Sequence, residues 1–276
     1  MYEEYTELLK SADKLRDDGD DVEQDFMYGN KNIEGKYNLW NLTGMADDFG
    51  IAVKVLEWIS SHIYHNNYFK ASIGRDAENL LEFSFDKEPE EGLNCRTMSI
   101  VLTECLLALN IKARTVYMMP ASPFENDNYV VSEVWIPTMH KWVMLDGTIG
   151  GYVTDKEGNP LGVLEVRTAL CEDKQLKFSK GIKYNREHII AKEVLGHYAK
   201  YMYCIMTYSI QGTASEELKE NKLIVGAPCG YDVMNSIRES ITNRKNHFEE
   251  PEIFTTCEED TDKIHLIYKG INFFKR

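Results

Sequence analysis

The feature that most constrains this chain is a cysteine placed between a polar loop and a long apolar run. Cys95 follows an acidic segment, residues 86–91, that contains Pro89. After Cys95, apolar residues recur with helical spacing. They are Met98, Val101, Leu102, Cys105, Leu106 and Leu109. The pattern predicts a buried helix that carries Cys95 in its first turn.

A cysteine at this position suits nucleophilic chemistry. The first turn of a helix has unpaired backbone N–H groups and the positive end of the helix dipole, and both favour a thiolate. The thiolate, rather than the thiol, is the nucleophile. A cysteine near a helix start is, however, more often a small buried side chain, so the sequence around it has to decide between the two interpretations.

The segment that follows predicts an antiparallel sheet. Residues 110–112 end the helix, and residues 113–118 have the pattern of a strand. Two alternating runs, residues 129–136 and 141–146, flank a short turn and predict a hairpin. A turn centred between Thr138 and Met139 places Asp146 opposite Val131, so that Tyr129 and Asp146 share one face of the sheet.

Four short segments, in this order and spacing, resemble the transglutaminase-like superfamily in its bacterial form. They are residues 94–96, 108–114, 130–135 and 141–146, with the sequences NCR, ALNIKAR, VVSEVW and KWVMLD. The resemblance is clear over residues 90–170 and looser from residue 50. It implies an α+β, papain-like core in which the cysteine-bearing helix packs on an antiparallel sheet, with helical extensions at both ends.

The resemblance also implies a division of the chain. Residues 1–50 form an N-terminal helical or irregular extension, and residues 51–170 form the transglutaminase-like core. Residues 171–276 supply a helix and strands that complete or cap the same domain.

The family uses a Cys-His-Asp triad, and this chain departs from it at one position. The cysteine maps to Cys95 and the aspartate to Asp146, but the position of the histidine holds Tyr129. In the family the histidine takes the thiol proton and later protonates the leaving group, while the aspartate orients it. A tyrosine, with an unperturbed pKa of about 10, is a poor base near neutral pH, but it can donate a hydrogen bond.

Another histidine could replace the missing base. His140 is excluded, because the length of the hairpin strand places it about 30 Å from Tyr129. The remaining histidines stay open as candidates: His62, His65, His188, His197, His247 and His265.

Other prominent residues have structural explanations. Trp135 and Trp142 fit a cross-strand pair, and Arg114 and Glu133 fit a structural ion pair. Residues 189–210 have helical spacing, and their tyrosines fit a helix packed between the sheet and a C-terminal cap.

Composition limits the partners and the compartment. The net charge of −14 argues against nucleic acid or an anionic membrane as a partner and is compatible with an amine-bearing substrate. The N-terminus has no secretory leader and no run is long enough to span a membrane, so we expect a cytoplasmic protein. The six cysteines form no C-x-x-C pair. We therefore expect reduced thiols, no metal site and no cofactor.

These observations favour an enzyme and give one leading hypothesis: acyl transfer through a thioester acyl-enzyme on Cys95. The acyl group would pass to an amine, forming an amide bond, or to water. The Cys95 backbone N–H would contribute to an oxyanion hole, Tyr129 would donate a hydrogen bond, and Asp146 would position Tyr129. Because an amide leaving group needs acid assistance, the missing histidine favours a more activated small-molecule or peptide-like donor, such as a thioester on a carrier protein.

Two alternatives remain. One is a conventional cysteine peptidase or amidase whose base is a histidine recruited from elsewhere in the chain. The other is a non-catalytic transglutaminase-like binding module that kept the fold and lost the base. The sequence names neither the donor, the acceptor nor the oligomeric state.

Overall fold

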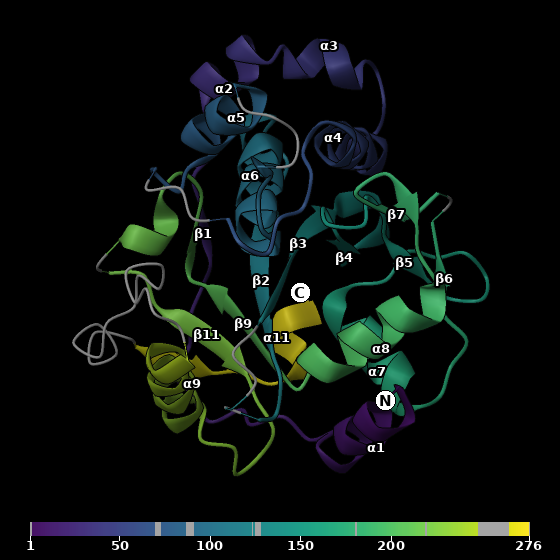
Figure 1. Ribbon diagram of the computed structural model, residues 1–276, viewed down its shortest axis with the longest axis vertical. Coiled ribbons are helices and arrows are strands. Elements are labelled where there is room, and N and C mark those ends of the chain that lie inside the picture. The colour runs from purple at the N-terminus through teal and green to yellow at the C-terminus, as the bar shows by residue number, and fades with distance from the viewer. Residues whose placement is uncertain are drawn as a thin grey trace.

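A six-stranded sheet forms the centre of the protein (Figure 1). The computed structural model describes residues 2–69, 73–86, 91–122, 124, 128–179, 181–218, 220–247 and 265–275. The strand order is β12-β11-β9-β2-β3-β4, antiparallel except for the β11–β12 pair. The strands are β2 (Ala113–Met119), β3 (Tyr129–Ile136), β4 (Lys141–Leu145), β9 (Cys204–Tyr208), β11 (Leu223–Gly226) and β12 (Leu266–Tyr268).

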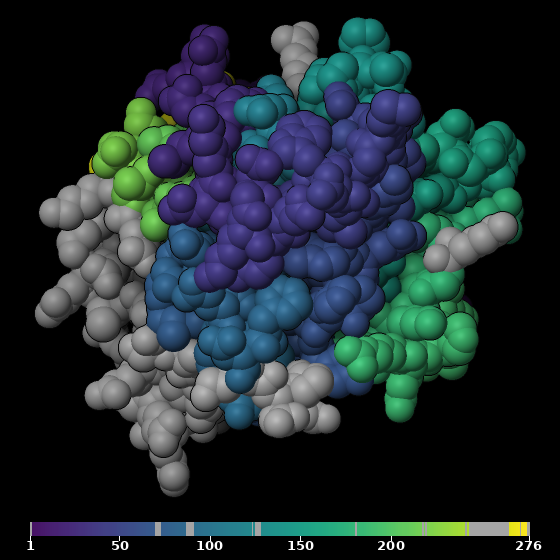
Figure 2. All heavy atoms as spheres, turned by 90° about the horizontal axis from the view of Figure 1, so that it is seen from above, coloured from purple at the N-terminus to yellow at the C-terminus, as the bar shows by residue number. Residues whose placement is uncertain are grey.

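One face of the sheet is covered by helices from the N-terminal half of the chain. The helix α6 (Cys95–Ala108) packs on β2 and β3, and α4 (Asp48–His62) and α5 (Ala77–Asp86) pack on α6. Ala113, Val134 and Leu145 of the sheet join their apolar core. Two short helices, α2 (Lys31–Lys36) and α3 (Leu39–Thr43), lie outside this layer. Figure 2 shows that this N-terminal part, in purple and blue, makes up much of the surface seen from above.

The opposite face carries a second group of helices: α1 (Tyr2–Ser11), α7 (Val163–Cys171), α8 (Ala191–Tyr201) and α11 (Ile271–Lys275). Val116, Val131 and Met144 face this side and pack with residues of α1, α7 and α8. A cysteine-bearing helix on a mostly antiparallel sheet, flanked by further helices at both ends of the chain, confirms the predicted α+β, papain-like class.

Short elements complete the described chain. Two-stranded pairs are formed by β1 (Asp25–Phe26) with β10 (Ile210–Gln211), β5 (Val153–Thr154) with β6 (Lys177–Phe178), and β7 (Lys183–Tyr184) with β8 (Glu187–His188). The helix α9 is Val233–His247, and the 3₁₀ turns η2 and η3 are Pro137–Met139 and Ser215–Glu217. Within the described residues, every helix is too short or too polar to cross a bilayer.

A ladder of buried hydroxyl groups fixes α6 against the sheet. Ser99 Oγ donates to the Val130 carbonyl at 2.9 Å, and Ser132 Oγ donates to the Ser99 carbonyl at 3.0 Å. Thr103 Oγ1 lies 3.1 Å from both Ser132 Oγ and Thr115 Oγ1. Because buried hydroxyls need partners, this ladder sets both the rotation and the depth of the helix.

The prediction of one helix over residues 189–210 is wrong in its second half. The helix α8 ends at Tyr201, and residues from Cys204 form β9, which lies between β2 and β11. The apolar residues of 204–208 also fit a helical spacing. Hydrogen bonding of their backbone to β2 and β11 makes this segment a strand. Residues 1–50, expected to form a helical or irregular extension, contain α1, α2 and α3. The three-part division of the chain stays a prediction.

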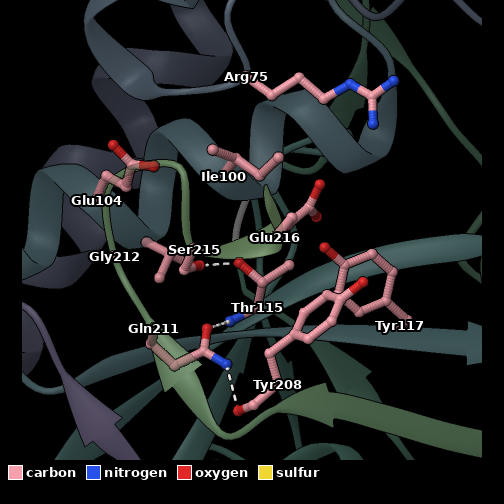
Figure 3. Close-up of a pocket in the computed structure, with 11 residues that line it drawn as sticks. Arg75, Ile100, Glu104, Thr115, Tyr117, Tyr208, Gln211, Gly212, Ser215 and Glu216 are labelled. Carbon is pink, nitrogen blue, oxygen red and sulfur yellow. Dashed lines mark hydrogen bonds between the residues drawn. The ribbon is translucent and has the colours of Figure 1, made fainter. Parts of the chain in front are cut away.

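A small polar pocket lies beside α6 and contains a buried carboxyl group (Figure 3). Glu104 is 3% exposed, and its Oε2 accepts a hydrogen bond from the Ala77 N–H at 3.0 Å. Burial raises the pKa of Glu104 to about 8; the Ala77 N–H opposes this shift and the nearby Asp76 adds to it.

The raised pKa of Glu104 makes stability depend on pH in a defined window. The folded state keeps a proton that the unfolded chain, with a pKa near 4.5, has already lost, so stability falls as pH rises from about 4.5 to 8. Glu104→Gln cannot ionise and should be more stable than wild type at pH 8 by up to about 4 kcal/mol, with little difference near pH 4.5. Thermal melts across this range would test it. The exposed Glu57→Gln is the control, and parallel pH profiles for wild type and Glu104→Gln would contradict the expectation.

Candidate active site

Cys95 is the first residue of α6, as the sequence predicts. Asn94 caps the helix, because its side-chain oxygen accepts the Thr97 N–H at 3.0 Å. The cysteine is half-buried, and its Sγ lies 3.9 Å from the carbonyl oxygen of Asn128, the residue before β3. The start of the helix and the start of the strand therefore meet at the thiol.

A neighbouring segment approaches the residues that precede Cys95. The Leu93 N–H donates to the Tyr64 carbonyl at 2.9 Å, and the Asn66 N–H donates to the Leu93 carbonyl at 2.8 Å. A Cβ on Gly92 would lie 2.1 Å from the Tyr64 oxygen, so only glycine fits there. This close approach holds His65, between Tyr64 and Asn66, beside the cysteine loop.

Asp146 is fully buried and is held by hydrogen-bond donors on both oxygens. The hydroxyls of Tyr129 and Tyr198 donate to its Oδ2 at 2.8 and 2.6 Å. The Thr148 N–H donates to its Oδ1 at 2.9 Å. Burial raises the pKa of Asp146, while the hydrogen bonds from Tyr198 and Tyr129 act in the opposite direction.

Tyr129 keeps its proton. Burial, followed by the negative charges of Asp146 and Cys95, raises its pKa well above 10. Cys95 packs against the apolar cluster that contains Tyr129, and its Sγ lies 3.9 Å from the carbonyl oxygen of Asn128, the residue before Tyr129. A phenol with a raised pKa cannot accept the thiol proton at neutral pH, and its own proton already lies on the hydrogen bond to Asp146.

The structure brings together Tyr129 and Asp146 as the predicted hairpin register requires. Ser132 pairs with Leu145, which sets Val131 opposite Asp146. Cys95 joins them from the helix. The catalytic roles of these three residues stay a prediction.

Two residues of α8 complete this cluster. Tyr198 was given no role at the site by the sequence interpretation, whereas His197 was one of its open candidates for the base. Tyr198 binds Asp146, and the ring of His197 stacks edge-on against Tyr129 with centroids 4.6 Å apart. His197 also contacts Tyr201, with a centroid distance of 4.7 Å. The available signal was an aromatic group on one turn of a predicted helix, which fits simple packing equally well.

His65 lies on the other side of the site. Its Nδ1 is 3.0 Å from the hydroxyl of Tyr184. Burial, and then the negative charge of Cys95, raise the pKa of Tyr184. Burial, and then the positive charge of His197, lower the pKa of His65 to about 4. His65 and His197 are therefore the open candidates that the structure brings to the site.

The other candidate histidines lie elsewhere. His62, His140, His188 and His265 are exposed, and the side chain of His247 lies outside the described part of the structure. The described cysteines, Cys95, Cys105, Cys171, Cys204 and Cys229, are free thiols, and Cys257 lies outside the described residues.

Comparison with known proteins agrees with the sequence resemblance. Residues 41–147 match the family model of the transglutaminase-like superfamily, which confirms the predicted resemblance over this part of the chain. No curated protein matches the chain.

Two solved structures show weaker likenesses. A candidate cysteine protease of Cytophaga hutchinsonii is 15% identical with a TM-score of 0.34, over 55% of this chain and 50% of that one. Legionella pneumophila LapG, in an EGTA-treated form, is 17% identical with a TM-score of 0.31, over 54% of this chain and 72% of that one. This chain thus spans half the length of the first structure. At such TM-scores the assignment of fold rests on the family match and the observed topology.

The two tyrosine hydroxyls on Asp146 should contribute measurably to stability. Tyr129→Phe and Tyr198→Phe each remove one donor from a buried carboxylate, and each should lower the free energy of unfolding by about 1–3 kcal/mol. Urea unfolding at pH 7 measures the loss. Tyr68→Phe, at a residue that is 79% exposed, is the matched control. Variants as stable as this control would show that the hydrogen bonds add nothing.

Proposed function

We propose that this protein is a cysteine-dependent acyl-transfer enzyme that forms a thioester with its substrate on Cys95. The observation that carries the proposal is the position of Cys95. It is the first residue of a capped, buried helix, half-buried at the point where the helix meets β3. The helix dipole and the unpaired N–H groups there favour the thiolate form.

The reaction has two steps. The Cys95 thiolate attacks the acyl carbon of the donor, the carbonyl oxygen becomes an oxyanion near the Cys95 N–H, and collapse expels the leaving group. An amine or water then attacks the thioester, loses a proton to solvent, and returns Cys95 as a thiolate. The product is an amide or a carboxylic acid.

The chemistry of Tyr129 favours an activated donor. Its hydroxyl is hydrogen-bonded to Asp146 and its pKa is raised, so it supplies no base and no readily transferred proton. A thiolate leaving group departs from a thioester without protonation, whereas an amine leaving group does not. A thioester donor, small or held on a carrier protein, therefore fits this site better than a peptide. Asp146 acts here by holding the ring of Tyr129 beside the thiol.

A second candidate is a conventional hydrolase in which a recruited histidine serves as the base. The observation in its favour is that His197 packs on Tyr129, which is itself a neighbour of Cys95.

The thioester intermediate can be detected directly. Wild-type protein mixed with a small acyl thioester should gain the mass of one acyl group, mapped to Cys95 by peptide analysis. Cys95→Ala should gain none. Cys229→Ala, at an exposed free cysteine, should behave as wild type. Equal acylation of Cys95→Ala would contradict the proposal.

The two candidates differ in their response at His197. If His197 is the base, His197→Ala should slow acylation by about 10²-fold or more, and the loss should be greatest below the pKa of the free thiol. If Cys95 needs no base and reacts with activated donors alone, the acylation rate of His197→Ala with a thioester should lie within about threefold of the wild-type rate. Single-turnover rates with matched thioester and amide donors separate the two.

A further inference from the structure

An open groove of about 410 Å³ adjoins the site and has no role in the reaction as described so far. It is lined by Tyr64, His65, Tyr184, Asn185 and Glu187. His65 lines the groove, and its segment pairs with Leu93, two residues before Cys95, so the groove lies beside the cysteine loop. A substrate attached to Cys95 has this space beside it.

The β7–β8 hairpin holds His65 by its backbone. The His65 N–H donates to Asn185 Oδ1 at 2.7 Å, and Asn185 Nδ2 donates to the His65 carbonyl at 2.9 Å. Asn185 and Arg186 form the tip of the hairpin with φ of 48° and 69°, a left-handed pair that asparagine accepts readily. The Arg186 guanidinium also stacks 4.5 Å from the centre of the Tyr64 ring. The groove wall and the backbone of His65 thus form one interlocked unit.

The imidazole of His65 has a hydrogen-bond partner at Nδ1 but none at Nε2 among the described residues. Tyr184 keeps its proton, because burial raises its pKa, so its hydroxyl can donate to Nδ1 of His65. His65 has a pKa of about 4 and is neutral at pH 7. When Tyr184 donates to Nδ1, the single ring proton lies on Nε2.

That Nε2 atom is buried and has no hydrogen-bond partner among the described residues. A buried, unsatisfied hydrogen-bonding group destabilises the folded state, and native proteins seldom keep one without a use. In the tautomer that accepts from Tyr184 at Nδ1, the ring can act by donating a hydrogen bond from Nε2.

We propose that His65 donates its Nε2 hydrogen bond to the carbonyl oxygen of the acyl donor, as the second member of an oxyanion hole with the Cys95 N–H. The groove between Tyr64 and Tyr184 then holds the acyl chain of that donor. This inference rests on the proposed acyl transfer. No proton moves to or from His65 in the step; negative charge grows on the carbonyl oxygen while the carbon–sulfur bond to Cys95 forms.

The test compares two reactions of the same thiol. Acylation by a small thioester passes through an oxyanion, whereas alkylation by iodoacetamide does not. His65→Ala should slow single-turnover acylation by about 10²- to 10³-fold and leave the alkylation rate within about threefold of wild type. His65→Gln keeps an N–H donor and should recover part of the loss. Tyr184→Phe removes the hydroxyl that fixes the tautomer of His65. Its acylation rate should lie between those of wild type and His65→Ala.

The controls separate a catalytic from a structural role. His188→Ala, at an exposed residue of the same hairpin, should match wild type in both reactions. A parallel fall of acylation and alkylation in both His65 variants would mean that His65 only supports the loop, and the inference would be wrong. It would also be wrong if both variants acylated as fast as wild type. If wild-type protein forms no acyl-enzyme with any donor, the proposed function itself fails and takes this inference with it. Should His65→Ala fail to fold, His65→Gln decides the question.

Discussion

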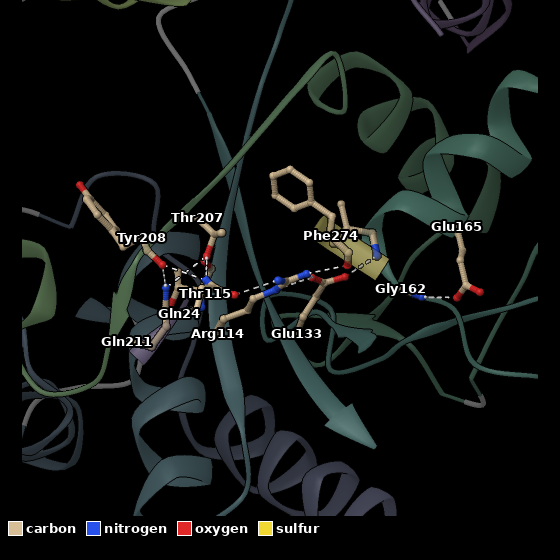
Figure 4. A network of polar contacts seen from close by, with 11 residues as sticks. Gln24, Arg114, Thr115, Glu133, Gly162, Glu165, Thr207, Tyr208, Gln211 and Phe274 are labelled. Carbon is tan, nitrogen blue, oxygen red and sulfur yellow. Dashed lines mark hydrogen bonds and ion pairs between the residues drawn. The ribbon is translucent and has the colours of Figure 1, made fainter. Parts of the chain in front are cut away.

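The buried ion pair between Arg114 and Glu133 ties the structure together (Figure 4). Their side chains are 0% and 2% exposed and meet at 2.7 Å, joining β2 to β3. The other oxygen of Glu133 accepts the Val163 N–H at the start of α7, and Arg114 also donates to the Phe274 carbonyl in α11. A buried charge pair is tolerated when such additional partners satisfy it. One interaction thereby fixes two central strands, a helix on the far face and the C-terminal end of the described chain.

The active-site cluster depends on that frame. The helix α7 packs against α8, and α8 carries Tyr198 and His197 to the site. Tyr129 and Tyr198 form a closed hydrogen-bond cluster around Asp146. Cys95 keeps its place at the start of α6, because that place is set by the helix and its hydroxyl ladder and not by Tyr129. In the proposed reaction, such a site can attack a carbonyl carbon but has no readily transferred proton at Tyr129.

Much of this could be read from local pattern. The spacing of apolar residues after Cys95 correctly predicts a helix with Cys95 in its first turn. The alternation in residues 129–146 predicts the strand register that unites Tyr129 with Asp146. The ion pair of Arg114 and Glu133 was expected from the same hairpin and strand. Residues 204–208 were misjudged, because their helical spacing carried no information about the two strands that would flank them.

The sequence by itself determined the cysteine-bearing helix and the hairpin, since each depends on residues close together along the chain. Only the tertiary structure decided what surrounds the thiol. Tyr198 reaches Asp146 across 52 residues, and Tyr184 reaches His65 across 119. Periodicity constrains which face of an element is buried, but not which distant element covers it. That choice follows from how the whole chain packs, and here it places Tyr198 on Asp146, His197 on Tyr129 and Tyr184 on His65.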